Sequence, residues 1–289
     1  MFFGVKQMAS DRPDRRNPAA SPLRHPDSTT PQPEAQIRQF FETLYFAWDR
    51  QHWWPARSRF EVIVGAYLTQ NTSWTNVEKA MAELRRQGAL SADAIRRMPL
   101  PVLERTIRSA GYFRQKARRL KTFVSFLDRQ YGGSLTRMFA QPTEKLREEL
   151  LALNGVGPET ADSILLYAGN HPVFVVDAYT RRILERHGLA EANADYEDIR
   201  ALFERALGSS MPSVSAFREN SREPGPGALA GNSTAGSAHP PSRMSTAVRP
   251  ELVQVFNEMH GLIVGVGKSY CKKSQMRCEQ CPLQGFLPG

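Results

Sequence analysis

The sequence predicts an all-α fold, and three observations support this prediction. Apolar residues recur at helical spacing through most of the chain from Ala35 onward. No segment alternates apolar and polar residues in the way that a half-buried strand requires. The 289 residues are 41% hydrophobic, which is enough to bury a sizeable core in one or two units.

Residues 1–35 are expected to form a disordered, mildly basic tail, because prolines recur from Pro13 to Pro33 among Arg, Ser and Asp. The apolar start, Met1 to Lys6, is too short for a signal peptide. No run of about 18 apolar residues offers a membrane span. We therefore expect a cytoplasmic protein, associated with the nucleoid if the source is bacterial.

The helical stripes that follow have the spacing of amphipathic helices. They cover Ile37–Trp48, Phe60–Leu68, Val77–Leu84, Lys116–Leu127, Thr143–Leu151 and Leu252–Ile263. Ser91 is a plausible cap for a short helix through Met98. Residues 209–249 are rich in Ser, Gly, Pro and Ala, and we expect a flexible insertion there. The last helix must then dock on the earlier ones.

The most informative segment is residues 153–177. Gly155 and Gly157 flank Val156 in a predicted turn, and Pro158 suits the first position of the next helix. The N-terminus of that helix offers unpaired N–H groups, which is a site suited to a phosphate. One carboxylate, Asp177, follows a short buried run. The unit is predicted to be a helix, a hairpin and a helix, followed by an acid at the start of another helix.

This segment resembles the helix-hairpin-helix, Gly/Pro, Asp motif of the endonuclease III superfamily of DNA glycosylases. The resemblance covers residues 36–208 and 250–287. It implies a fold of two helical lobes with a cleft between them, in which the N- and C-terminal parts share one lobe. It also implies a monomeric DNA-repair enzyme that binds double-stranded DNA with damaged bases. In the family the hairpin, here Asn154 to Gly157, grips DNA phosphates.

By the same resemblance, Asp177 lies beside the sugar of an extruded nucleotide. A carboxylate there stabilises the positive charge that builds on the sugar when the glycosidic bond breaks, and can orient a nucleophile. The alternative is that Asp177 only caps a helix over Ala178–Arg186. The two roles are compatible.

Glu159 departs from the family pattern. Members that also cleave the strand carry Lys at this place, and that amine forms a Schiff base with the sugar. A carboxylate cannot, so the sequence predicts a glycosylase without lyase activity. Glu159 itself is interpreted as an exposed acid that favours the helix dipole, or as a second carboxylate near the site.

Trp53-Trp54-Pro55, followed by Leu68-Thr69-Gln70-Asn71-Thr72, resembles the bacterial 3-methyladenine DNA glycosylase III branch. In that branch aromatic side chains line the base pocket, and a cationic methylated base gains by stacking on them. Trp54 and Trp74 are the pocket candidates, with Trp53 as a third. Core packing is the alternative for each of them.

The family pattern also places Gln70 and Tyr112 where side chains wedge into the duplex. The alternatives are a buried amide and an ordinary loop aromatic. Four basic residues follow, and they are interpreted as phosphate contacts or as a solvated helix face; they are Lys116, Arg118, Arg119 and Lys121.

The spacing Cys271-x6-Cys278-x2-Cys281 matches the first three ligands of the family's [4Fe–4S] loop, but Leu287 stands where the fourth is expected. Three alternatives stay open: a cluster with a substitute ligand, a remnant loop held by packing, or a zinc site with His260. In each case Lys272, Lys273 and Arg277 keep the loop basic and able to contact phosphate.

The formal charge of +9 and the pI near 9.7 fit a polyanionic partner. The leading expectation is a base excision repair glycosylase that flips a damaged, alkylated base and hydrolyses its glycosidic bond. One alternative is a glycosylase and lyase acting on oxidised pyrimidines. Another, from a different class, is a DNA-binding protein without catalytic activity.

Overall fold

The computed structural model describes residues 32–208 and 241–288. Within these ranges the chain is helical, and an isolated bridge between Cys271 and Met276 is the only extended pairing. The expected tail up to residue 31 and the expected insertion from 209 to 240 lie outside the described residues. Among the described helices none is long and apolar enough to cross a membrane.

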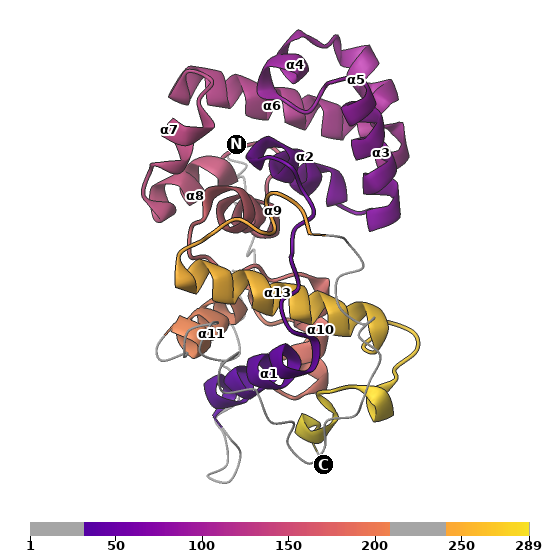
Figure 1. Ribbon diagram of the computed structural model, residues 1–289, viewed down its shortest axis with the longest axis vertical. Coiled ribbons are helices and arrows are strands. Elements are labelled where there is room, and N and C mark those ends of the chain that lie inside the picture. The colour runs from indigo at the N-terminus through magenta and orange to yellow at the C-terminus, as the bar shows by residue number, and fades with distance from the viewer. Residues whose placement is uncertain (1–31, 209–240, 289) are drawn as a thin grey trace, which may run out of the picture.

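Two lobes are stacked along the long axis of the molecule (Figure 1). The first lobe is the continuous middle of the chain. Its helices are α2 (Arg59–Thr69), α3 (Trp74–Arg86), α4 (Ala92–Arg97), α5 (Leu100–Thr106), η1 (Arg108–Ala110), α6 (Phe113–Tyr131), α7 (Leu135–Phe139) and α8 (Thr143–Leu151). Ser91 caps α4 as predicted, because its hydroxyl accepts the N–H of Ala94.

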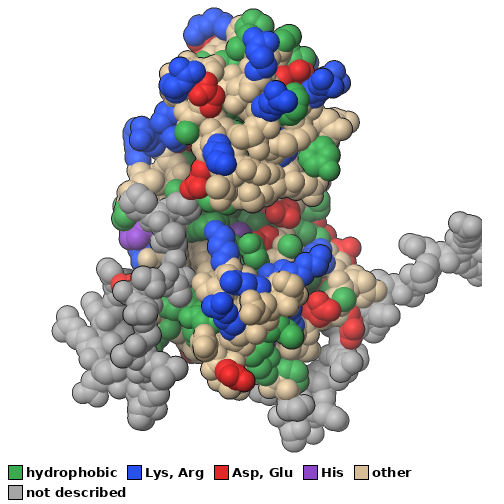
Figure 2. Space-filling view, turned by 90° about the vertical axis from the view of Figure 1, so that its right-hand side faces the viewer, with side chains coloured by type: hydrophobic (Ala, Val, Ile, Leu, Met, Phe, Trp, Pro, Cys, Tyr) green, Lys and Arg blue, Asp and Glu red, His purple; other side chains and the backbone are tan. Residues whose placement is uncertain are grey.

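The second lobe combines the two ends of the described chain. It contains α1 (Pro33–Trp48), α10 (Ala178–Arg186), α11 (Tyr196–Gly208), α13 (Glu251–Ser269) and the short turns η3 (Cys278–Gln280) and η4 (Gln284–Phe286). The apolar face of α1 packs on α11 and α13, and α10 packs on α13. The surface is hollowed between the two lobes (Figure 2).

The predicted hairpin is present between the lobes. After α8 the chain turns at Gly155, whose φ of +78° favours glycine, and α9 (Pro158–Ser163) begins at the predicted proline. The helix continues as a π-helical turn, η2 (Ile164–Gly169), which packs on α2 and α13. A buried extended run, 173–176, then leads to α10.

Two boundaries differ from the prediction. Helix α1 begins at Pro33, because a proline at the first position suits a helix and Glu34 favours its dipole. Residues 241–249 belong to the expected insertion, yet they contact the segment that joins α1 to α2. Met244 donates its N–H to Ala56 O at 3.0 Å, and the Ser242 hydroxyl donates to Trp54 O at 3.3 Å. These backbone partners hold the segment in place.

Candidate active site

Asp177 caps α10. Its Oδ1 accepts the N–H of Thr180 at 2.8 Å and the Thr180 hydroxyl at 3.0 Å. The Asp177 backbone N–H donates to Thr180 Oγ1 at 3.4 Å, which completes a capping box. Its Oδ2 lies 3.6 Å from His260 Nε2. Burial raises the pKa of Asp177, but the contact with His260 and the bonds from Thr180 outweigh it, so the pKa lies below its ordinary value. The helix-cap interpretation is confirmed, and the bonds from Thr180 go to one of the two carboxylate oxygens.

His260 joins Asp177 to Tyr167. The imidazole is buried on α13, and its Nδ1 pairs with the hydroxyl of Tyr167 in the π-helical turn. Burial, and then the charge of Asp177, raise the pKa of Tyr167 well above its ordinary value, so the phenol keeps its proton. A donating Tyr167 makes Nδ1 the acceptor, which places Nε2–H opposite Asp177. Residue spacing did not predict this arrangement.

Glu159 lies in the first turn of α9, close enough to Asp177 for the two charges to influence each other. Its side chain is solvent-accessible, yet protein atoms surround it closely enough for desolvation to raise its pKa to about 7, and the charge of Asp177 adds to this rise. His260 and Arg181 act in the opposite direction. The site therefore holds two carboxyl groups whose pKa values are shifted apart.

The three predicted pocket tryptophans form one cluster. Trp54 packs edge-on against Trp74, with 5.3 Å between ring centroids, and its ring is tilted against Tyr167 at 5.2 Å. Trp53 lies 6.2 Å from His260, and the Trp53–Trp54 peptide is cis. Trp53 and Trp54 are buried and Trp74 is partly buried. Core packing thus describes the first two, and their contact with a base stays a prediction.

Lys268 adds a cation to this cluster. Its Nζ lies 5.4 Å from the ring centroid of Trp53, within the range of a cation–π contact. Desolvation lowers the pKa of Lys268, and the charges of Glu78 and Asp177 counteract this. The side chain is solvent-accessible at the end of α13. An ammonium near Asp177 was not predicted, because a single lysine at a helix end carries no motif.

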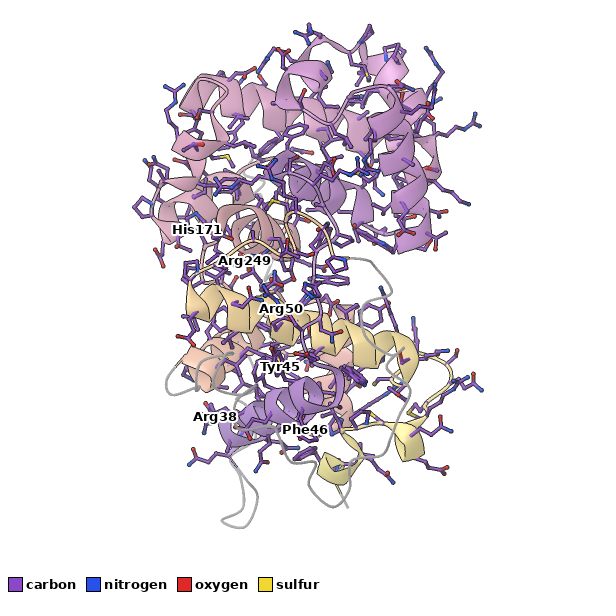
Figure 3. The ribbon with its side chains drawn as sticks, viewed as in Figure 1. Arg38, Tyr45, Phe46, Arg50, His171 and Arg249 are labelled. Carbon is purple, nitrogen blue, oxygen red and sulfur yellow. The ribbon has the colours of Figure 1, made fainter. Side chains whose placement is uncertain are left out.

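A buried carboxylate fixes the segment that carries the tryptophans. Glu258 on α13 accepts the N–H of Gln51 at 2.6 Å and lies 3.4 Å from Arg50 Nε. Burial raises the pKa of Glu258. Arg249 lies nearby at the junction of the lobes, and its charge acts in the opposite direction (Figure 3). Residues 50–54 are in this way tied to α13.

The hairpin contacts the end of α2 through Gln70. The Gln70 amide donates to Gly155 O and to Thr160 Oγ1, both at 2.9 Å, and its oxygen accepts from Arg119 at 2.6 Å. Gly157 and Asn154 are exposed, whereas Val156 is buried. The half-buried, bonded amide matches the alternative given for Gln70, and its wedging into a duplex stays a prediction.

Tyr112 is the most exposed aromatic side chain among the described residues, at 66%. It stands at the N-cap of α6 with a φ of +42°.

The interpretation of the following lysines as phosphate contacts is wrong for two of them. Lys116 is buried against Leu68 O and Ala110 O, and Lys121 donates to three carbonyls at the end of α4. Carbonyl oxygens at helix ends are the partners that an ammonium finds there.

The three cysteines line one pocket in the second lobe, together with His187 and Leu287. The Cys281 thiol is desolvated and lies near the other two, which raises its pKa to about 11. Arg186 donates to Cys271 Sγ at 3.0 Å.

No His, Cys, Asp or Glu group within 32–208 and 241–288 is arranged to hold a metal ion. A [4Fe–4S] cluster normally uses four thiolates, and this pocket offers three, with Leu287 at the expected fourth position and His187 also in the lining. The zinc site with His260 is wrong, because His260 contacts Tyr167 and Asp177 and does not line the cysteine pocket.

The basic loop beside the cysteines is anchored by α10. Arg182 donates to Cys271 O at 2.7 Å, and Arg186 donates to Lys273 O at 3.5 Å. Lys273 and Arg277 are exposed, and Lys272 is half-buried. Their contact with phosphate stays a prediction.

Known proteins are similar to this chain in sequence and in fold. A family model described as "HhH-GPD superfamily base excision DNA repair protein" matches residues 64–208. A Methanocaldococcus jannaschii protein named "Putative DNA repair glycosylase MJ1434" is 36% identical over 254 residues, which are 86% of this chain and 94% of that protein. Endonuclease III of Thermotoga maritima is 30% identical over 143 residues, 50% of this chain and 63% of that protein.

Two solved structures are similar along most of their length. The H. pylori 3-methyladenine DNA glycosylase MagIII, bound to 1,N6-ethenoadenine, matches with a TM-score of 0.61 and 26% identity, covering 82% of this chain and 97% of that one. A trapped endonuclease III–DNA covalent intermediate matches with a TM-score of 0.63 and 20% identity, covering 88% and 95%. The chain belongs to the HhH-GPD superfamily of base excision DNA repair proteins. It is a DNA glycosylase of that type.

Proposed function

We propose that this glycosylase removes an alkylated base by hydrolysis and leaves the DNA strand intact. The observation that carries the proposal is the carboxyl group of Glu159 beside Asp177, at the hairpin position where strand-cleaving members have an amine. A carboxylate cannot attack C1′ to form a Schiff base. Water is then the nucleophile, and the product is an abasic site with a hydroxyl at C1′.

In the proposed reaction the two carboxyl groups have different tasks. Asp177, whose pKa is lowered, is ionised and stabilises the positive charge that develops on the sugar as the bond to the base breaks. Glu159, with a pKa of about 7, accepts a proton from the attacking water. The water oxygen bonds to C1′, and the electron pair of the broken bond leaves with the base. His260 orients Asp177.

The proposed substrate is an alkylated purine. The aromatic cluster of Trp53, Trp54 and Trp74 lies beside His260 and Tyr167, next to the proposed reaction centre. An electron-rich aromatic surface favours a cationic or extended purine ring. The similar H. pylori enzyme is named a 3-methyladenine glycosylase and was crystallised with ethenoadenine, which supports this class of base.

The proposed DNA contacts surround the hollow. The hairpin from Asn154 to Gly157 takes a phosphate, and the basic loop with Lys272, Lys273 and Arg277 takes others. Gln70 and Tyr112 enter the duplex where the base leaves the stack. The enzyme acts as a monomer, and no step of the reaction passes through an iron–sulfur cluster.

Base release from matched duplexes tests the proposal. The wild-type protein is incubated with duplexes carrying 3-methyladenine, ethenoadenine or thymine glycol, and the free base is quantified. We expect release of the adenine derivatives, and loss of release with Asp177→Asn, which keeps the helix cap. Release of thymine glycol alone would contradict the proposed substrate class. Equal inactivity of both proteins, with DNA binding retained, would instead indicate a binding protein.

A further inference from the structure

Lys116 is a buried cation that no step of the proposed reaction uses. It projects from α6 with 1% of its surface exposed, and its ammonium donates to Leu68 O at 2.9 Å and to Ala110 O at 2.7 Å. Desolvation, together with the nearby Arg119, lowers its pKa to about 8. Burying an ammonium is unfavourable unless partners compensate for the lost hydration. The two carbonyls provide that compensation.

The two carbonyls belong to two different segments at the hollow. Leu68 lies two residues before Gln70 at the end of α2, and Ala110 lies two residues before Tyr112 at the start of α6. The backbone N–H of Lys116 also donates to Tyr112 O at 3.1 Å. One side chain thus links both segments that are proposed to enter DNA.

A second residue on the same face of α6 extends the link. Arg119, one helical turn after Lys116, donates to Gln70 Oε1, and the Gln70 amide donates to the hairpin at Gly155 O. The hairpin, the end of α2 and the start of α6 are therefore joined through α6 side chains. Figure 1 shows α6 lying across α2 in the first lobe.

We propose that Lys116 is a positioning residue for base extrusion: its two hydrogen bonds fix the separation between the segment of Gln70 and the segment of Tyr112. Two wedges must enter the duplex together to replace an extruded base. A displacement of about 1 Å at such a site can lower a rate on the order of 100-fold. This inference rests on the proposed function, because the wedge roles of Gln70 and Tyr112 belong to it.

Lys121 provides a matched control. It projects from the same helix, and its ammonium also binds backbone carbonyls, those of Ile95, Arg96 and Met98. These carbonyls lie at the end of α4 and not on the segments of Gln70 and Tyr112. Removing either ammonium takes away the same kind of contact from the same lobe. Only Lys116 links the two proposed wedges.

The test measures extrusion separately from hydrolysis. All variants are made in an Asp177→Asn background, and extrusion is followed by the fluorescence of 2-aminopurine placed beside ethenoadenine in a duplex. Lys116→Met is expected to slow the fluorescence rise about 10- to 100-fold, with affinity for undamaged duplex unchanged. Lys116→Gln keeps a shorter hydrogen-bond donor, so its fluorescence rise is expected to slow less than that of Lys116→Met. Lys121→Met is expected to extrude the base at the same rate as the Asp177→Asn background protein. Both Met variants are expected to lower the melting temperature.

Each outcome has a defined meaning. Background-like extrusion by Lys116→Met, or equal losses in Lys116→Met and Lys121→Met, would overturn the positioning role. If Lys116→Met does not fold, the comparison of Lys116→Gln with Lys121→Gln decides in the same way. If the background protein itself extrudes no damaged base, the proposed function fails first, and this result is distinct from a failure of Lys116 alone.

Discussion

His260 Nε2 lies 3.6 Å from Asp177 Oδ2, while Nδ1 of the same ring pairs with the Tyr167 hydroxyl. The imidazole therefore lies near one oxygen of the carboxylate, and Thr180 donates hydrogen bonds to the other. A carboxylate whose one oxygen is hydrogen-bonded by its own helix is oriented before substrate arrives, which is the condition for electrostatic stabilisation without reorganisation.

The first prediction concerns this orientation. His260→Gln is expected to lower the single-turnover rate of base release on the order of 10-fold, and Tyr167→Phe is expected to lower it less, because the ring of His260 stays in place. Affinity for damaged duplex is expected to stay unchanged in both. A variant that loses affinity and keeps its rate would place His260 in DNA binding.

The second prediction is a pH dependence of the rate. Because Glu159 accepts a proton in the proposed reaction, its ionised form is the active one, and base release should rise as the pH increases through about 7. In Glu159→Gln the rate should no longer rise with pH, and at pH 8 it should be about 100-fold below the wild-type rate. Rates measured under single-turnover conditions at saturating enzyme provide the profile. A wild-type rate that falls over this range would assign Glu159 the role of an acid.

The third prediction follows from the same pKa and concerns stability. The folded-state pKa of Glu159 is raised from 4.5 to about 7, so the folded protein binds the proton more tightly than the unfolded chain. The stability that this group contributes is fully present below pH 4.5 and is lost as the pH rises to about 7. Glu159→Gln is expected to show a smaller loss of unfolding free energy over this range. Urea titrations at several pH values measure the unfolding free energy of both proteins. Parallel pH dependences of this free energy would contradict the prediction.

The fourth prediction introduces the missing amine. Glu159→Lys places an amine beside Asp177, and we expect borohydride to trap a covalent complex with damaged duplex in this variant but not in the wild-type protein. Glu159→Gln is the matched control and should give no complex. Trapping by the wild-type protein would show that another amine attacks C1′.

The fifth prediction separates the two hairpin glycines. A Cβ on Gly155 would lie 1.9 Å from Arg119 Nε, and its φ is +78°, so Gly155→Ala should destabilise the protein by about 1–3 kcal/mol. Nothing lies within 4 Å of a Cβ on Gly157. Gly157→Ala should therefore fold normally and weaken binding where the hairpin approaches a phosphate. Thermal unfolding and salt-dependent DNA titrations distinguish the two, and equal stability losses would be inconsistent with this account.

The hairpin and its flanking helices were predictable because their signals are local. Proline at the start of α9, glycine in the turn and a capping Asp177 each act on their own neighbours. Contacts between distant segments gave no such signal. His260 belongs to the apolar stripe of α13, and spacing alone does not indicate that its ring meets Tyr167 and Asp177. Lys116 was misread for the same reason, since its carbonyl partners come from other elements.

The most direct measurement is the state of the DNA strand after base release. Wild-type protein is incubated with an end-labelled duplex carrying ethenoadenine, and the strand is analysed before and after alkali. We predict an intact strand that alkali then cleaves at the abasic site, because water has attacked C1′. Strand breaks before alkali, in the absence of any added lyase, would contradict a hydrolytic site formed by Glu159 and Asp177.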